Sequence, residues 1–136
     1  MTTKVYYDAD GAILGRLGSV VCKELLKGKE VVVINSEKSI ISGDRQRIVA
    51  DISWWKNLGG RGLKGPKVSR MPHLLLKRMI RGMLPWDRKR GRDAYHRLRC
   101  YIGNGDLKKE ELNQVKSVEV KKPIKYVTLA EVSREI

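Results

Sequence analysis

The sequence lacks any long hydrophobic run, and it contains only two cysteines, Cys22 and Cys100. No stretch approaches the roughly 18 consecutive apolar residues that a membrane span needs, so we expect no membrane partner. The cysteines show no CxxC spacing, which argues against a disulfide framework and a zinc site, and we expect both to be small core residues. Residues 1–10 lack a basic segment followed by an apolar run, so the predicted location is the cytoplasm.

Motifs that bind nucleotides or perform catalysis are also missing. The glycines of residues 11–18 are spaced G-x3-G-x2-G, which departs from the G-x-G-x-x-G dinucleotide motif. Gly28 and Lys29 lack the other residues of a phosphate-binding P-loop. His73 and His96 lie in a basic region, where neighbouring positive charge opposes protonation of an imidazole. We therefore expect no enzyme activity, no cofactor, no metal and no small-molecule substrate.

Acidic residues are scarce in the middle of the chain, where most of the positive charge lies. Residues 45–99 hold 16 Lys and Arg but only 3 acidic residues, whereas the rest of the chain holds 13 basic and 12 acidic residues. Such uncompensated charge is typical of a protein that binds a polyanion, because neutralising phosphates releases condensed counterions. Trp54 and Trp86 are flat groups that can stack on exposed bases, which favours RNA. DNA is disfavoured, since no recognition-helix pair or zinc module is present.

The candidate RNA-binding residues are the basic and the two aromatic side chains of this central segment. They are Arg45, Arg47, Trp54, Lys56, Arg61, Lys64, Lys67, Arg70, Lys77, Arg78, Arg81, Trp86, Arg88, Lys89, Arg90, Arg92, Arg97 and Arg99. Residues 59–70 contain four glycines, one proline, four basic residues and no acid. Because this stretch has too little apolar surface to offset the entropy lost on ordering, we predict a mobile basic loop that RNA would order.

Hydrophobic patterns predict alternating strands and helices in the first part of the chain. Residues 5–7 form a β-prone run, residues 14–25 carry apolar side chains at helical spacing, and residues 31–34 are a continuous β-branched run. The last pattern is typical of a strand covered on both faces, as in a parallel sheet. Together they indicate a βαβ unit with a right-handed crossover. We expect the small Gly15 and Gly18 to let the helix lie close to a neighbouring strand.

Two further helices are predicted in the basic segment. One has Ser42 as its N-cap and turns Ile48 and Ile52 toward the core. The other begins at Pro72, which suits the first turn of a helix, turns apolar residues as far as Met83 toward the core and is closed by Pro85. Both helices are therefore expected to bury one face and to leave their basic residues accessible.

The patterns become shorter toward the C-terminus. A short helix is predicted through Ala94 and Leu98. In the strand predicted next, Leu98, Cys100 and Ile102 alternate with Arg99 and Tyr101. The tail contains a polar helix near residues 107–112, a β-like stretch at 118–120 and a C-terminal helix capped by Thr128.

Several segments resemble one protein family. Residues 8–17 (DADGAILGRL), 81–85 (RGMLP) and 97–103 (RLRCYIG), with residues 32–38 between them, are similar in order and spacing to the large-subunit ribosomal protein L13 family in its archaeal form. The resemblance implies an α/β fold with three α/β/α layers around a four-stranded, mainly parallel sheet. It also implies a role in binding and folding large-subunit rRNA.

These observations lead to one expectation and two alternatives. We expect residues 1–136 to form a single L13-like domain, with the basic loop at 59–70 and a mixed-charge C-terminal extension at 104–136. It would be a non-catalytic, monomeric constituent of the large ribosomal subunit, with rRNA and neighbouring ribosomal proteins as partners. The alternatives are an RNA-modifying enzyme, which would need a substrate pocket with a titratable group, and a free architectural nucleic-acid-binding protein, which would prefer duplex DNA.

Overall fold

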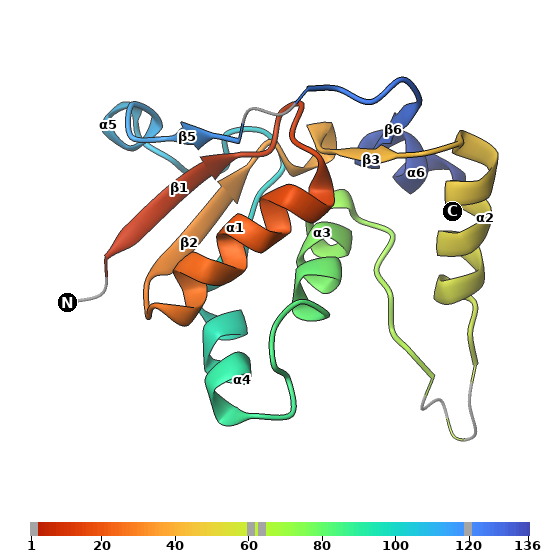
Figure 1. Cartoon of the computed structure of the whole chain (residues 1–136), viewed down its shortest axis with the longest axis horizontal. Helices are drawn as coiled ribbons and strands as arrows, with labels where there is room; N and C mark the ends of the chain where they lie inside the picture. Colours follow the sequence, from red (N-terminus) through yellow and green to blue (C-terminus); the bar gives the residue numbers. More distant parts are fainter. Residues whose placement is uncertain (1–2, 60–61, 63–64, 119–120) are drawn as a thin grey trace.

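A four-stranded sheet forms the centre of the protein. The computed structural model describes residues 3–59, 62, 65–118 and 121–136, and Figure 1 shows how its elements are arranged. The sheet has the order β4-β2-β1-β5, and every pair of neighbouring strands is parallel. The strands are β1 (Lys4–Asp8), β2 (Glu30–Ile34), β4 (Leu98–Cys100) and β5 (Lys116–Ser117). The predicted four-stranded, mainly parallel sheet is confirmed.

The first two strands and the helix between them form the predicted βαβ unit. Helix α1 (Leu14–Leu26) connects β1 to β2, and the strands pair in parallel from Lys4 opposite Glu30 onward. After the helix, Gly28 adopts a φ of +93°, a left-handed conformation that glycine takes without a steric penalty. The buried residues of α1 recur every three or four positions and so share one helix face: Leu14, Leu17, Gly18, Val21, Cys22 and Leu25.

Helices cover one face of the sheet and a shorter segment covers the other. The face that carries Val5 and Val31 packs against α1, α3 (Pro72–Arg81) and α4 (Lys89–His96) in the main hydrophobic core. On the opposite face, Tyr6 and Val32 pack in a smaller cluster with side chains from residues 101–115, which include α5 (Lys109–Leu112). Successive strand residues point to opposite faces, so β1 and β2 are buried on both sides. The result is the three-layer α/β/α arrangement.

A two-stranded sheet beside the main one anchors the C-terminal segment. Strand β3 (Ile40–Ser42), which follows the short helix η1 (Ser36–Lys38), pairs antiparallel with β6 (Tyr126–Thr128). Helix α6 (Leu129–Glu135) begins directly after β6, and Thr128 Oγ accepts a 3.3 Å hydrogen bond from the Glu131 N–H, which confirms the predicted N-cap. Figure 1 shows that α6 and the chain end lie beside α2 (Arg45–Lys56).

Several local predictions are wrong. Helix α3 ends at Arg81 and β4 ends at Cys100, so Met83 and Ile102, which were expected to belong to these elements, lie beyond them and are 41% and 45% exposed. Ser42 belongs to β3, and the N-cap of α2 is Asp44, because pairing with β6 keeps the chain extended through Ser42. A Cβ added at Gly15 would meet no described heavy atom within 4 Å, whereas at Gly18 it would lie 2.6 Å from the Met83 sulfur. Gly18 thus permits close packing against the segment after α3 instead of a strand, and Gly15 makes no close approach. The strand expected at 118–120 is displaced, because β5 ends at Ser117 and Val118 lies outside it. Residues 119–120 are outside the described part.

Within the described residues, no helix combines the length and the hydrophobicity that crossing a membrane requires.

Candidate nucleic-acid interface

Helix α4 presents basic side chains to solvent because its inner face is made of small residues. Its buried residues are Gly91 and Ala94. A Cβ at residue 91 would collide with the main-chain carbonyl of Pro85, so the helix backbone lies directly against the preceding turn. Four predicted site residues are consequently exposed at the start of this helix: Arg88, Lys89, Arg90 and Arg92.

The basic residues of α3 lie against aromatic rings. The Arg81 guanidinium is 3.9 Å from the centroid of the Trp86 ring, and Lys77 Nζ is 4.9 Å from that of Tyr95. The two rings meet edge to face, with centroids 5.2 Å apart and an interplanar angle of 87°. Such cation–π contacts hold a cation in place without neutralising it. The half-buried Trp86 therefore has one ring face occupied by Arg81 in the free chain.

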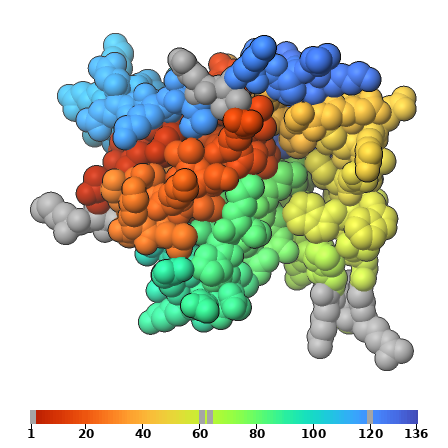
Figure 2. All heavy atoms as spheres, in the orientation of Figure 1, coloured from red at the N-terminus to blue at the C-terminus, as the bar shows by residue number. Residues whose placement is uncertain are grey.

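Seven basic residues of the predicted site lie along α3, α4 and the turn between them. We call them the α3–α4 cations: Lys77, Arg78, Arg81, Arg88, Lys89, Arg90 and Arg92. Figure 2 shows the α3–α4 segment, green to teal, as a continuous part of the surface. Among the residues that the structure describes, none of these seven forms a salt bridge, although Asp87 and Asp93 lie in the same segment. Their positive charge is thus uncompensated by carboxylates.

Three other predicted site residues are bound to the end of α6. Arg45 pairs with the Glu135 carboxylate, and Lys56 Nζ donates to the Ile136 carbonyl at 3.4 Å. Arg70 donates from Nε to the Ser133 carbonyl at 3.0 Å and from Nη2 to the Arg134 carbonyl at 3.1 Å. The last carbonyls of a helix have no intrahelical partner and carry partial negative charge, so cations there stabilise the helix end. We call Arg45, Lys56 and Arg70 the α6-bound cations.

Arg92 on α4 and Arg97 at its end also make hydrogen bonds within the fold. Arg92 Nη1 donates to the carbonyls of Trp86 and Asp87 at 3.1 and 3.3 Å, which braces the turn before α4. Arg97 is half-buried, and its Nη2 donates to the Leu25 carbonyl at 2.7 Å, which ties the end of α1 to the start of β4. Arg97 is therefore primarily a link between two elements.

The other predicted site residues that the structure describes are spread over the surface. Arg47 and Lys67 are exposed, and Trp54 on α2 is 68% exposed, so its ring is open to solvent. Arg99 is exposed on β4, where it pairs in register with Val32 and so lies on the sheet face opposite α1 and α3. Arg61 and Lys64 lie outside the described residues.

The cysteines are buried in the core, as predicted. Burial raises the pKa of the Cys22 thiol to about 11 and that of Cys100 to about 12. A nucleophilic cysteine needs a thiolate near neutral pH, so neither thiol is suited to catalysis.

Sequence reasoning missed the part played by residues 133–136. Their contribution comes mainly from main-chain carbonyls, together with the Glu135 carboxylate and Ser133 Oγ, which donates to the Arg70 carbonyl at 2.7 Å. Main-chain acceptors carry no sequence motif, and the residues that these carbonyls bind are 63 to 80 positions away. The only local indication was the capped C-terminal helix itself.

Comparisons of the sequence with known proteins identify the family to which it is similar. The family model described as "Ribosomal protein L13" matches residues 2–106. A protein named "Large ribosomal subunit protein uL13" from Archaeoglobus fulgidus is 46% identical over 133 residues, covering 93% of this chain and 83% of the relative. Proteins of the same name from Methanopyrus kandleri and Methanococcoides burtonii are 44% and 41% identical, covering 95% of this chain and 84% and 94% of the relatives.

Proposed function

Because the chain belongs to the ribosomal protein L13 family, we propose that it is a structural constituent of the large ribosomal subunit that binds large-subunit rRNA and helps it fold. Its relatives carry the name of a large-subunit protein. In this proposal one copy of the chain acts within a cytoplasmic ribosome, beside neighbouring ribosomal proteins. No catalytic step is assigned to it, since the family supplies structural constituents of ribosomes.

The observation that carries the rRNA-binding proposal is the state of the α3–α4 cations. Seven basic side chains lie on consecutive elements, and no described carboxylate pairs with them. An array of cations with unsatisfied charge binds phosphates through electrostatic attraction and counterion release. Phosphate contacts should outnumber contacts to bases, as they do in most protein–nucleic-acid interfaces.

The residues of α3 and α4 have different roles in this proposal. Arg88, Lys89 and Arg90 are exposed and would reach phosphates directly. Lys77 and Arg81 lie on the rings of Tyr95 and Trp86, so their charge is held near the surface at little further entropic cost. This arrangement favours contact with closely approaching rRNA strands.

A second part of the proposed interface is the exposed surface of α2 and the connection that follows it. Arg47 and Lys67 would contribute phosphate contacts, and Trp54 has an open ring that suits stacking on a base. Arg61 and Lys64, in the glycine-rich stretch at 59–70, remain predicted contacts. The loop would enter an RNA cleft between strands.

The proposal is tested by the salt dependence of rRNA binding. Replacing Arg88, Lys89 and Arg90 by Ala should make the slope of log affinity against log salt shallower by about 2 to 3, because each lost phosphate contact removes about 0.7 to 0.9. The control replaces Lys109, Lys121 and Lys122, three exposed lysines of the C-terminal part, and removes the same charge. Both variants should melt at the wild-type temperature.

An equal slope change in the two variants would contradict the proposed interface, since it would report net charge alone. Competition at matched salt separates RNA from DNA binding. Structured rRNA should displace the chain from duplex DNA, and a preference for the duplex would favour the architectural alternative instead.

A further inference from the structure

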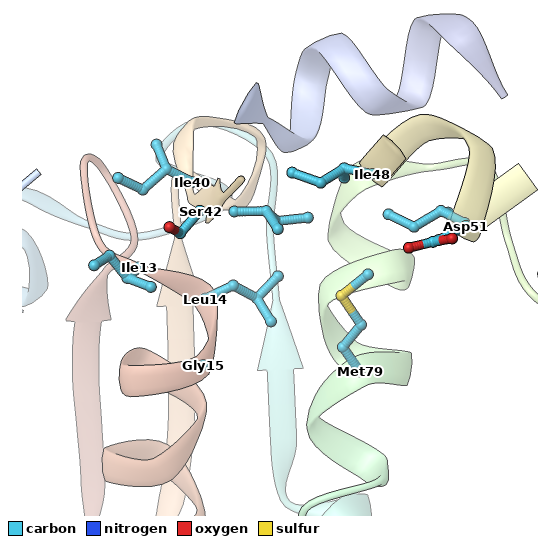
Figure 3. Close-up of a pocket in the computed structure, with 10 residues that line it drawn as sticks. Ile13, Leu14, Gly15, Ile40, Ser42, Ile48, Asp51 and Met79 are labelled. Atoms are coloured by element: carbon cyan, nitrogen blue, oxygen red, sulfur yellow. The ribbon is translucent and has the colours of Figure 1, made fainter. Parts of the chain in front are cut away.

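An apolar pocket opens between four elements on the side of the protein that carries β3. Its volume is about 300 Å³, and it lies between the start of α1, β3, α2 and Met79 of α3, as Figure 3 shows. Its walls are mainly isoleucine and leucine side chains: Ile13, Leu14, Ile40, Ile41, Ile48 and Ile52. The polar side chains in its lining are Ser42 and Asp51. An apolar side chain of a partner could be buried there.

The charge of the pocket differs from that of the rest of the molecule. The chain has a net charge of +14, yet the one charged residue in the lining is Asp51. Asp51 forms no salt bridge with any residue that the structure describes, including Arg47 one turn earlier on α2. A free carboxylate repels phosphate and attracts a cation. The pocket therefore favours a basic protein segment over RNA.

Gly15 supplies an independent indication that the pocket is kept open. It lines the pocket, and a Cβ added there would meet no described heavy atom within 4 Å. Glycine inside a helix costs about 0.5–1 kcal/mol relative to alanine, and the fold around Gly15 gives no steric reason for that cost. Gly18, one turn later, has such a reason in the Met83 sulfur. Close approach by a partner would explain the missing side chain at position 15.

We propose that this pocket docks a segment of a neighbouring large-subunit protein, in which an apolar side chain fills the cavity and an adjacent Lys or Arg pairs with Asp51. This inference rests on the proposed function, because it places the chain in a ribosomal subunit. The surface lies on α1, β3 and α2 and uses none of the α3–α4 cations. One protein can thus contact rRNA and a second protein through different surfaces.

The test uses large subunits isolated from cells that express the full chain with a photoreactive benzoylphenylalanine in place of Arg16, an exposed residue of α1 that adjoins Gly15 but does not line the pocket. Irradiation should join this position to a peptide of another large-subunit protein that contains an apolar residue beside Lys or Arg. Asp51→Asn should lower the yield of this product by up to about fivefold, the effect of losing one exposed ion pair. The same photoreactive residue at Lys23, which is exposed two turns further along α1, should not give this product.

A second measurement separates docking from folding. Gly15→Leu fills the pocket, whereas Gly15→Ala adds only a methyl group and favours the helix. In cells that express each variant beside wild type, Gly15→Leu should be depleted from finished subunits by about tenfold or more, a cost typical of an overfilled site. Gly15→Ala should enter the subunits like wild type, and both purified variants should melt no lower than wild type and keep the wild-type rRNA affinity.

Each contrary outcome has a distinct meaning. Crosslinks from position 16 to rRNA or to this chain itself, or the absence of any crosslink, would overturn the docking proposal, as would equal incorporation of Gly15→Leu and wild type. The proposed function would be untouched by those results. A chain that fails to sediment with large subunits would overturn both proposals.

Discussion

The α3–α4 cations and the α6-bound cations belong to the same central basic segment of the sequence but have different surroundings in the fold. The first group is free of carboxylates, and two of its members lie on aromatic rings. The second group binds a glutamate and three main-chain carbonyls at the end of α6. Positive charge in the sequence therefore serves two purposes. One set is available to a polyanion, and the other fixes the C-terminal helix beside α2.

Only part of the basic residues in the central segment is therefore free to bind a polyanion. A count of Lys and Arg overestimates the number of residues that are free to bind phosphate, because some of them satisfy acceptors within the chain. Arg92, itself one of the α3–α4 cations, and the nearby Arg97 show the same effect, since each donates to main-chain carbonyls. The surroundings of each cation decide its role.

The largest effect is expected where α4 meets the preceding turn. Gly91→Ala would place a Cβ against the Pro85 carbonyl, a backbone group that cannot move aside alone. We expect the free energy of unfolding to fall by about 1–3 kcal/mol, the usual cost of overfilling a packed site. Urea unfolding measures this loss. Gly15→Ala is the control, and equal stability of the two variants would show that α4 does not need the close contact.

Trp54 and Trp86 should respond differently to replacement by alanine. Trp54→Ala should weaken rRNA binding by about 1–3 kcal/mol if the open ring stacks on a base, with little change in melting temperature. Trp86→Ala should lower the melting temperature, because it removes the contacts to Arg81 and Tyr95, a cation–π contact alone being worth about 0.5–2 kcal/mol. Filter binding and thermal melting distinguish them. A reversed pattern would mean that Trp86 is the stacking platform.

Replacing Arg70 should affect the fold more than rRNA binding. Arg70→Ala removes two donors from the end of α6, and we expect a loss of about 1 kcal/mol in the free energy of unfolding. Arg70→Lys keeps the charge but not the paired geometry, so it should recover only part of the loss. Hydrogen exchange of residues 129–136 would locate the change. A normal exchange pattern combined with a shallower salt slope would move Arg70 to the phosphate-binding group.

The smallest effect is expected from the core thiols at alkaline pH. The pKa values of Cys22 and Cys100 rise from 9.0 in the unfolded reference to about 11 and about 12 in the folded chain. Their stabilising contribution is full below pH 9 and is lost as pH rises toward these values, because the unfolded thiols ionise first. At pH 9 the loss is roughly 0.4 kcal/mol per thiol.

The measurement compares wild type with a Cys22→Ala, Cys100→Ala variant by urea unfolding in reductant at pH 7 and pH 9. The stability difference between the two proteins should shift against wild type at the higher pH. A difference independent of pH would show that the thiols ionise equally well in the folded chain.

The βαβ unit and the main sheet could be predicted because their patterns are local. The β-branched run at 31–34 and the helical spacing of residues 14–25 specify their elements without reference to distant residues. The pairing of β3 with β6 joins Ile40 to Thr128 across most of the chain, and no local pattern encodes such a partner. Ser42 was consequently read as a helix cap when it is a strand residue.

In the candidate site, too, the features set by local sequence could be predicted and those set by distant residues could not. The exposure of Arg88, Lys89 and Arg90 followed from a dense basic stretch at the start of a short helix. The binding of Arg45 and Arg70 to α6 could not be foreseen, because their acceptors belong to residues 133–135 and become neighbours only when β3 and β6 pair.

The most direct test of this division is a structure of the large ribosomal subunit that contains the chain. We predict that the head groups of Arg88, Lys89 and Arg90 lie within hydrogen-bond distance of rRNA phosphate oxygens, while Arg45, Lys56 and Arg70 keep their bonds to residues 133–136. A structure in which the α6-bound cations contact phosphates and the three α4 residues face solvent or protein would contradict the account.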